Sequence, residues 1–82
     1  MPTFMDVHRE MHGLTAAALT EVHRADLAIE SDEQVHFERV WADPKTGHLF
    51  CLSEGPSREA VMRVHARAGH PTSEVYEVAL SI

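Results

Sequence analysis

The 82-residue chain is predicted to form a single α+β domain with four antiparallel strands and two helices. Two observations support this fold class. Four segments are rich in β-forming residues or alternate between two faces, and two segments between them carry apolar residues at helical spacing. The composition, with 44% apolar and 24% charged residues, four glycines and four prolines, is typical of one compact domain spanning residues 1–82.

The first half of the chain has the pattern of a strand, a helix and a strand. Residues 4–9 alternate in a period of two, as in a half-buried strand. Thr15 is a suitable N-cap, and apolar residues recur at helical spacing from there to about Glu30. Residues 35–41 are rich in β-branched and aromatic side chains and form the second predicted strand.

The second half repeats the pattern in the order strand, helix and strand. Residues 43–47 contain Pro and Gly and predict a hairpin that leads into a third strand at residues 48–54. Ser57 is the expected N-cap of the second helix, and Gly69 is expected to end it. Residues 75–82 alternate again and form the fourth predicted strand.

The resulting order, βαββαβ, is typical of the ferredoxin-like fold. We expect the strand order 4-1-3-2, with both helices on one face of the sheet and the other face open. An open apolar face favours sheet-to-sheet association, so we also expect a homodimer that forms a dimeric α+β barrel.

The apolarity of the side chains predicts which face each strand residue occupies. Met5 and Val7 are expected to face the helices. The same is expected of three residues in the last strand: Tyr76, Val78 and Leu80. Asp6, His8 and Glu77 would then share the open face, where they would meet the equivalent residues of a partner subunit.

The most unusual feature of the composition is the number of histidines. The chain contains seven: His8, His12, His23, His36, His48, His65 and His70. Imidazole binds metals and transfers protons near neutral pH. The formal charge of −6, with only seven Lys and Arg, argues against a nucleic-acid partner and suits cation binding.

The predicted topology gathers four histidines at one corner of the domain. His8 and His12 lie at the exit of the first strand, while His65 and His70 lie at the end of the second helix and just after it. The fourth strand, which follows His70, neighbours the first strand in the expected order. His36 and His48 are expected to be surface residues.

Carboxylates extend this candidate site. Asp26 lies three residues after His23, so the two share a helix face and form a conditional pair of ligands. Asp6 and Glu77 join the site if the open sheet face is a dimer interface. The candidate metal ligands are therefore His8, His12, His65, His70, His23, Asp26, Asp6 and Glu77. Nitrogen and oxygen ligands of this kind suit Ni, Cu, Zn or Fe.

Other kinds of site have less support in the sequence. Cys51 is the only cysteine, so no intrachain disulfide can form, and its apolar neighbours predict a buried thiol. No segment approaches the ~20 apolar residues of a membrane span, and no signal peptide is evident, so we expect a cytoplasmic protein without a membrane partner. Catalytic motifs such as H-E-x-x-H or a Gly-rich phosphate loop are absent, and no catalytic residue is assigned.

Three segments resemble a family of small bacterial ferredoxin-like domains of unknown function. They are MPTFMDVHR at residues 1–9 with Gly13, FCLSEGPS at residues 50–57, and RAGHP at residues 67–71 followed by EVYEV at residues 74–78. The family includes an actinobacterial nickel-binding homodimer with metal ions at the subunit interface. The resemblance therefore implies a ferredoxin-like fold, a homodimer and nickel as the metal.

We therefore expect a homodimeric protein that binds a divalent transition metal through histidine and carboxylate ligands near the dimer interface. Ni²⁺ is expected most of all, with Zn²⁺ and Cu²⁺ as other candidates. Sequestration, buffering or delivery of the metal would be its role. The main alternative is a dimeric α+β-barrel small-molecule binder or a cofactor-free monooxygenase-like enzyme, for which an elongated apolar cavity lined by histidines is expected. A third possibility is a structural or interaction domain whose histidines share no role.

Overall fold

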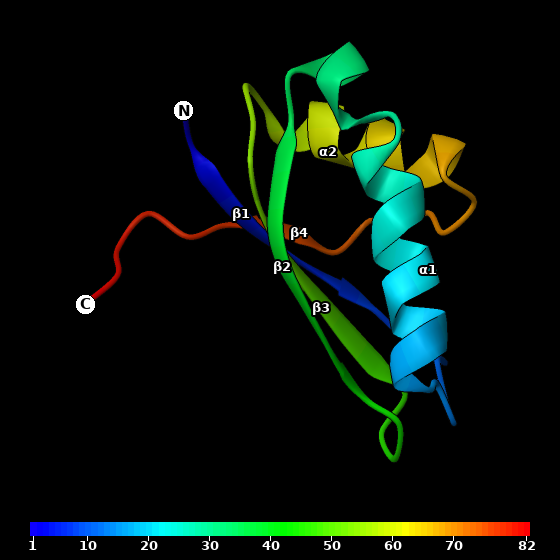
Figure 1. Ribbon diagram of the computed structural model, residues 1–82. Coiled ribbons are helices and arrows are strands. Elements are labelled where there is room, and N and C mark those ends of the chain that lie inside the picture. Colours follow the sequence, from blue (N-terminus) through cyan, green and yellow to red (C-terminus); the bar gives the residue numbers. More distant parts are fainter.

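The computed structural model describes residues 1–82 and has the predicted order of elements (Figure 1). The strands are β1 (Thr3–His8), β2 (His36–Asp43), β3 (His48–Glu54) and β4 (Val75–Glu77), and the helices are α1 (Ala16–Leu27) and α2 (Arg58–Arg67). A short 3-10 helix, η1 (Glu30–Glu33), follows α1. All strand pairs are antiparallel in the order β2-β3-β1-β4, which confirms the ferredoxin-like fold.

Local signals in the sequence set the boundaries of the helices. The Thr15 hydroxyl accepts a hydrogen bond from the backbone N–H of Ala18 at 3.1 Å, and the Ser57 hydroxyl accepts one from Ala60 at 3.2 Å. These side chains satisfy N–H groups that have no partner within the helix, so both predicted N-caps are confirmed. After α2, Gly69 has a φ of 93°, a conformation that favours glycine.

Two elements are shorter than the sequence predicts. Helix α1 ends at Leu27, because Glu30 belongs to η1 and its carboxylate accepts a 2.7 Å hydrogen bond from the start of β2. Strand β4 ends at Glu77 instead of continuing to residue 82. The N–H of Val78 still donates to the carbonyl of Thr3, where β1 begins, so residues beyond Val78 have no strand to pair with.

The two faces of β1 are the reverse of those we expected. Asp6 and His8 face the helices with exposed fractions of 0% and 5%, whereas Met5 and Val7 are half-buried on the open face. The expectation followed the apolarity of Met5 and Val7 and was wrong. A shift of one residue along a strand moves every side chain to the other face.

The expected positions of the residues in and after the last strand were also wrong. Tyr76 is paired with Met5, so it lies on the open face, where it is 55% exposed. Val78 and Leu80 are also exposed and do not pack under the helices. Glu77 pairs with Phe4 at the edge of the sheet and is exposed, so Asp6 and Glu77 do not project together from the open face.

The apolar core lies between the sheet and α2. Nine buried residues form it: Phe4, Val35, Phe37, Leu49, Cys51, Ala60, Val61, Val64 and Val75. Helix α1 contributes only half-buried apolar side chains to this core, among them Leu19 and Val22. The sole fully buried residue of α1 is Asp26. Polar interactions therefore have a large share in holding α1 against the rest of the domain.

The open face of the sheet is largely apolar. Half-buried side chains on it are Met5, Val7, Phe50 and Leu52. Trp41 extends this face with an exposed fraction of 36%, and the Arg39 guanidinium lies 5.1 Å from the centre of its ring. The apolar side chains form a continuous patch across β1 and β3, of the kind that mediates association between proteins.

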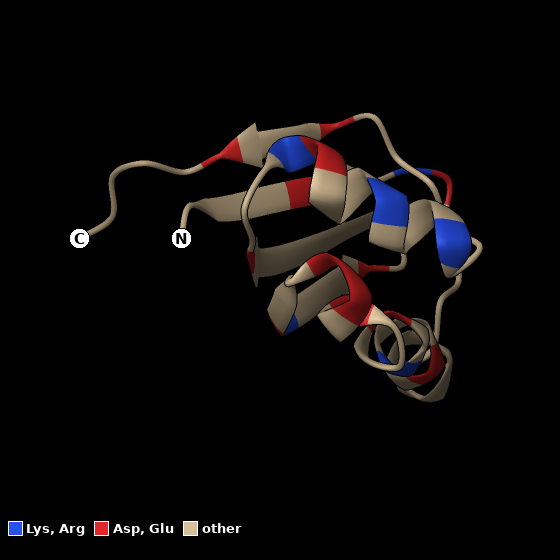
Figure 2. Cartoon of the chain, turned by 90° about the horizontal axis from the view of Figure 1, so that it is seen from above, with Lys and Arg blue, Asp and Glu red and all other residues tan.

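Charged residues are distributed over the outer surface without a basic stripe. Figure 2 shows Lys and Arg interspersed with Asp and Glu along the helices. On α2, Arg63 pairs with Glu33 at 2.9 Å and Arg67 with Asp32 at 3.1 Å, so two of its arginines are neutralised by η1. None of the helices has both the length and the apolar character needed to span a membrane.

Candidate metal centre

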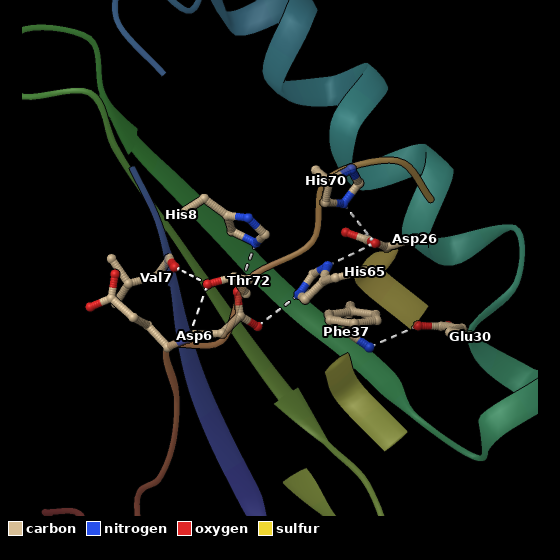
Figure 3. A network of polar contacts seen from close by, with 10 residues as sticks. Asp6, Val7, His8, Asp26, Glu30, Phe37, His65, His70 and Thr72 are labelled. Atoms are coloured by element: carbon tan, nitrogen blue, oxygen red, sulfur yellow. Dashed lines mark hydrogen bonds and ion pairs between the residues drawn. The ribbon is translucent and has the colours of Figure 1, made fainter. Parts of the chain in front are cut away.

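Three imidazoles and two carboxylates converge between the sheet and the two helices (Figure 3). We call this group the buried histidine cluster; its members are Asp6, His8, Asp26, His65 and His70. The side chains of Asp6, Asp26 and His65 are fully buried, and that of His70 is 13% exposed. Charged and polar groups are rarely buried to this degree unless they are paired or bind a metal.

Four separate parts of the chain bring the cluster together. Asp6 and His8 alternate with Phe4 on the helix-facing side of β1. Asp26 is in the last turn of α1, and His65 is in the last turn of α2, directly after the core residue Val64. Both residues therefore lie at the C-terminal end of a helix, where the partial negative charge of the helix favours a nearby cation.

The loop after α2 places His70. The backbone N–H of His70 donates to the carbonyl of His65 at 3.0 Å, immediately after the turn at Gly69. Further along, the Thr72 hydroxyl donates to the carbonyl of Val7 at 2.6 Å, which fastens the loop to β1. The His70 ring therefore closes the outer side of the cluster.

His65 is the centre of the cluster because both of its ring nitrogens contact carboxylates. Nε2 lies 2.8 Å from Oδ2 of Asp6, and Nδ1 lies 3.0 Å from Oδ1 of Asp26. Burial alone would lower the pKa of His65, but hydrogen bonds to Asp26 and Asp6 and their charges raise it to about 9. With both nitrogens donating, the ring is an imidazolium held between two carboxylates.

The carboxylates are ionised for the complementary reason. Burial alone would raise the pKa values of Asp6 and Asp26, but the hydrogen bonds from His65 lower both. The 3.0 Å contact of Asp6 with His8 and the hydrogen bond between Asp26 and His70 act in the same direction. The Asp26 oxygen that contacts His65 is shared with Nε2 of His70 at 2.8 Å. Two buried negative charges therefore face one buried positive charge.

Several polar atoms of the cluster have lone pairs or protons without a hydrogen-bond partner. Nε2 of His8 and Oδ1 of Asp6 are 3.0 Å apart but do not form a hydrogen bond, and Oδ2 of Asp26 is likewise without a partner. A buried polar atom in this state costs about 1–3 kcal/mol. The cluster thus contains nitrogen and oxygen atoms without partners, and these are atom types that bind transition metals.

The spacing of these atoms suits metal coordination. Potential ligand atoms of Asp6, His8, Cys51 and His65 all lie within 4.8 Å of one another, and so do those of Asp26, His65 and His70. Ligands about 2 Å from a common ion are separated by up to ~4 Å, so small side-chain adjustments bring either group into coordination distance. The three imidazole rings also contact each other, with centroids 4.7–5.4 Å apart.

Of the eight residues proposed from the sequence, the structure brings together the five members of the cluster. His12 is outside it, exposed and 3.5 Å from Glu10. His23 is half-buried with Nδ1 unpaired, and Glu77 is exposed at the sheet edge. A metal-binding role for these three residues stays a prediction. His36 is exposed, as expected, and His48 is half-buried beside Arg9 at 3.0 Å.

Cys51 is the member of a possible ligand group that sequence reasoning missed. It is buried, as expected, but it pairs across the sheet with Asp6 and so points toward the cluster. The antiparallel register of β1 and β3 is the signal that would have revealed this. Burial, together with Asp6 and Asp26, raises the pKa of the thiol well above its usual range.

The structure gives no support to the organic-ligand alternative. A small-molecule binder of this fold would need a concave, mostly apolar pocket. The chain contains no such pocket. The histidines that this alternative would place around a ligand are instead packed against each other and against Phe37, whose ring centre lies 4.9 Å from that of His65.

A substitution at His65 tests the energetic role of the imidazolium. We expect His65→Gln to lower the free energy of unfolding by about 3–5 kcal/mol, because it leaves two buried carboxylates without their cation. Urea denaturation of the metal-free protein measures this. His36→Gln is the control, since that side chain is 63% exposed and should change stability by about 0.5 kcal/mol or less. Equal effects of the two substitutions would contradict the assignment.

The raised pKa of His65 also predicts how stability depends on pH. The imidazolium stabilises the folded chain fully below pH 6.5, its ordinary pKa, and this contribution is lost as the pH rises through about 9. Urea midpoints measured across this range in a chelator should therefore fall in the wild type more than in His65→Gln. Parallel curves for the two proteins would show that His65 carries no such charge.

Comparisons with known proteins identify the family. The family model described as nickel responsive protein SCO4226-like matches residues 4–78. The crystal structure of SCO4226 from Streptomyces coelicolor A3(2) is similar, with 62% sequence identity and a TM-score of 0.95 over 98% of this chain and 99% of that chain. No curated protein matches. The chain therefore belongs to the SCO4226-like family of nickel-responsive proteins.

Proposed function

We propose that this protein binds a divalent transition metal, with Ni²⁺ as the physiological ion, through the buried histidine cluster. The observation that carries the proposal is the convergence of three imidazoles and two carboxylates from β1, α1, α2 and the loop after α2. Imidazole and carboxylate together suit Ni²⁺ as well as Zn²⁺ and Cu²⁺. Membership of a family described as nickel responsive favours nickel among these ions.

Charge balance supports a divalent ion in particular. The two carboxylates of Asp6 and Asp26 carry two negative charges in a buried environment, and neutral imidazoles add none. One divalent cation matches that charge, and the C-terminal ends of both helices favour it further. No additional anion has to enter the site.

The hydrogen bonds of His65 support binding through a prearranged site. Metal-binding histidines usually donate their second ring N–H to a carboxylate or a carbonyl, which fixes the orientation of the ring. Asp6 and Asp26 lie at the two nitrogens of His65, so either nitrogen can bind an ion while the other donates to a carboxylate. The cluster therefore needs little rearrangement to accept a metal.

For the biological role, we propose sequestration, buffering or delivery of nickel in the cytoplasm by a homodimer. The chain is a small domain without a ligand pocket, which suits holding an ion more than transforming a substrate. The apolar open face of the sheet supports the homodimer. The cluster lies on the helix side of the sheet, so this dimer would leave each metal site within one subunit.

Calorimetric titration of untagged protein with Ni²⁺ tests the metal site. We expect micromolar or tighter binding by the wild type, and loss of binding in the double variant His8→Ala/His70→Ala. The control is His12→Ala/His36→Ala, which removes two imidazoles that are 58% and 63% exposed and should leave the affinity unchanged. Absence of binding to the wild type at ~100 μM metal, equivalent to only about −5.5 kcal/mol, would refute the proposal.

Size-exclusion chromatography with light scattering tests the homodimer. Leu52→Glu places a charge in the middle strand pair of the open face, so we expect the dimer to dissociate into monomers. Ala17→Glu, on the exposed side of α1, is the control and should leave the mass unchanged. A monomeric wild type, or a dimer that Leu52→Glu does not affect, would rule out association through this face.

A further inference from the structure

Residues 78–82 form an apolar tail that leaves the sheet after β4. The tail has the sequence Val-Ala-Leu-Ser-Ile and contains no charged residue. Its large apolar side chains are all exposed, and that of Leu80 has an exposed fraction of 94%. Figure 1 shows the tail extending away from the sheet. These side chains therefore contact little of their own chain.

The alternation of the tail places its apolar side chains on the same side as the open face of the sheet. Tyr76, in β4, lies on that face, and side chains two residues apart along a strand point to the same side. The N–H of Val78 donates to the carbonyl of Thr3 at 2.9 Å, so the extended backbone continues beyond β4. In an extended tail, Leu80 and Ile82 continue the same row. This apolar row prolongs the open face past the end of the sheet.

We propose that the tail of each subunit crosses to the partner subunit of the homodimer and packs its apolar row on the partner's open face. The inference rests on the homodimer proposed above and names the segment that completes its interface. It differs from a dimer formed by the two sheets alone, in which both tails would stay in solvent.

The tail is poorly suited to cover the open face of its own chain. It leaves the sheet in the direction of β4, so it would need a turn to come back over that face. The residues that favour turns, Gly, Pro, Asn and Asp, are absent from it. Even a tight turn uses two residues. Too few residues would then remain to cover an apolar surface.

A second copy of the chain can receive the tail without such a turn. A two-fold axis across the strands reverses the strand direction in the partner subunit. With the two sheets offset along the strands, the part of each chain that extends beyond its own sheet then lies over the sheet of the other. The five residues span about 17 Å when extended, and stacked sheets are about 10 Å apart. The tail is therefore long enough to reach the partner's open face and to lie along it.

The open face offers a matching apolar surface. Phe50 and Leu52 lie on it in β3 and are half-buried, and Trp41 lies on it in β2 with an exposed fraction of 36%. Because the tail is uncharged, it can cover these side chains without burying a charge. Full burial of one exposed Leu or Ile side chain strengthens binding about tenfold or more.

Sedimentation equilibrium of the untagged protein tests the contribution of the tail. We expect Leu80→Asp to raise the dissociation constant of the dimer about 100-fold, because each of the two tails loses one buried leucine. The control is Ala79→Asp, which introduces the same charge on the other side of the tail and should change the dissociation constant little. Both side chains are exposed in the single chain, so both variants are expected to fold.

The outcomes separate the tail from the homodimer itself. If Leu80→Asp and the wild type have equal dissociation constants while Leu52→Glu gives monomers, the exchange of tails is wrong and the homodimer stands. Equal weakening by Leu80→Asp and Ala79→Asp would also overturn the exchange, because the apolar row would then have no special role. A wild type that is monomeric would refute the homodimer together with the exchange.

Photo-cross-linking tests where the tail lies. Leu80 is replaced by the photoreactive residue benzoylphenylalanine, the protein is irradiated, and the linked peptides are identified by mass spectrometry. We expect a covalent dimer in which position 80 is joined to the open face of the partner subunit, at β1 or β3. The same replacement at Ala17, which is exposed on α1, is the control and should give no covalent dimer. Links confined to one chain would show that the tail folds back and would overturn the proposal.

Discussion

The contact of His65 with two carboxylates is the interaction on which the rest of this structure depends. It joins β1 through Asp6, α1 through Asp26 and α2 through His65 itself, at distances of 2.8 and 3.0 Å. Helix α1 has no fully buried apolar residue, so its connection to the domain relies on Asp26 as well as on half-buried side chains such as Leu19. At this end of the molecule an ionic network replaces the apolar core that small domains usually need.

Such a network lowers the stability that an 82-residue chain can reach. Burying charged groups costs several kcal/mol per ion, and well-packed apolar residues in their place are often equally stabilising or better. In addition, one polar atom in each of Asp6, His8 and Asp26 has no hydrogen-bond partner. Selection for stability alone does not favour such residues, which agrees with the proposed use of these atoms as metal ligands.

The sequence predicted the features that local physics decides and missed those that depend on tertiary partners. The caps at Thr15 and Ser57 and the strand order followed from short-range signals and from the βαββαβ order. The topology also placed His8, His12, His65 and His70 at one corner, and the structure brings together three of them, with His12 exposed outside the cluster. The face of β1 was wrong, because apolarity was used to assign it and the partner that makes Asp6 suitable for burial is His65, 59 residues further along the chain. The pairing of Cys51 with Asp6 depends on the register between β1 and β3, which the residue pattern of one strand does not determine.

The cluster requires a positive charge both as a part of the fold and as a metal site. Two buried carboxylates and two helix C-termini demand a positive charge at this position. In the metal-free chain the His65 imidazolium supplies that charge, and the ring is held by the same carboxylates that would orient it toward an ion. A metal ion would take over the electrostatic role of that charge and add bonds to atoms that are otherwise unpaired. Under the proposed function, the cluster would therefore stabilise the fold before metal arrives and bind metal without first being assembled.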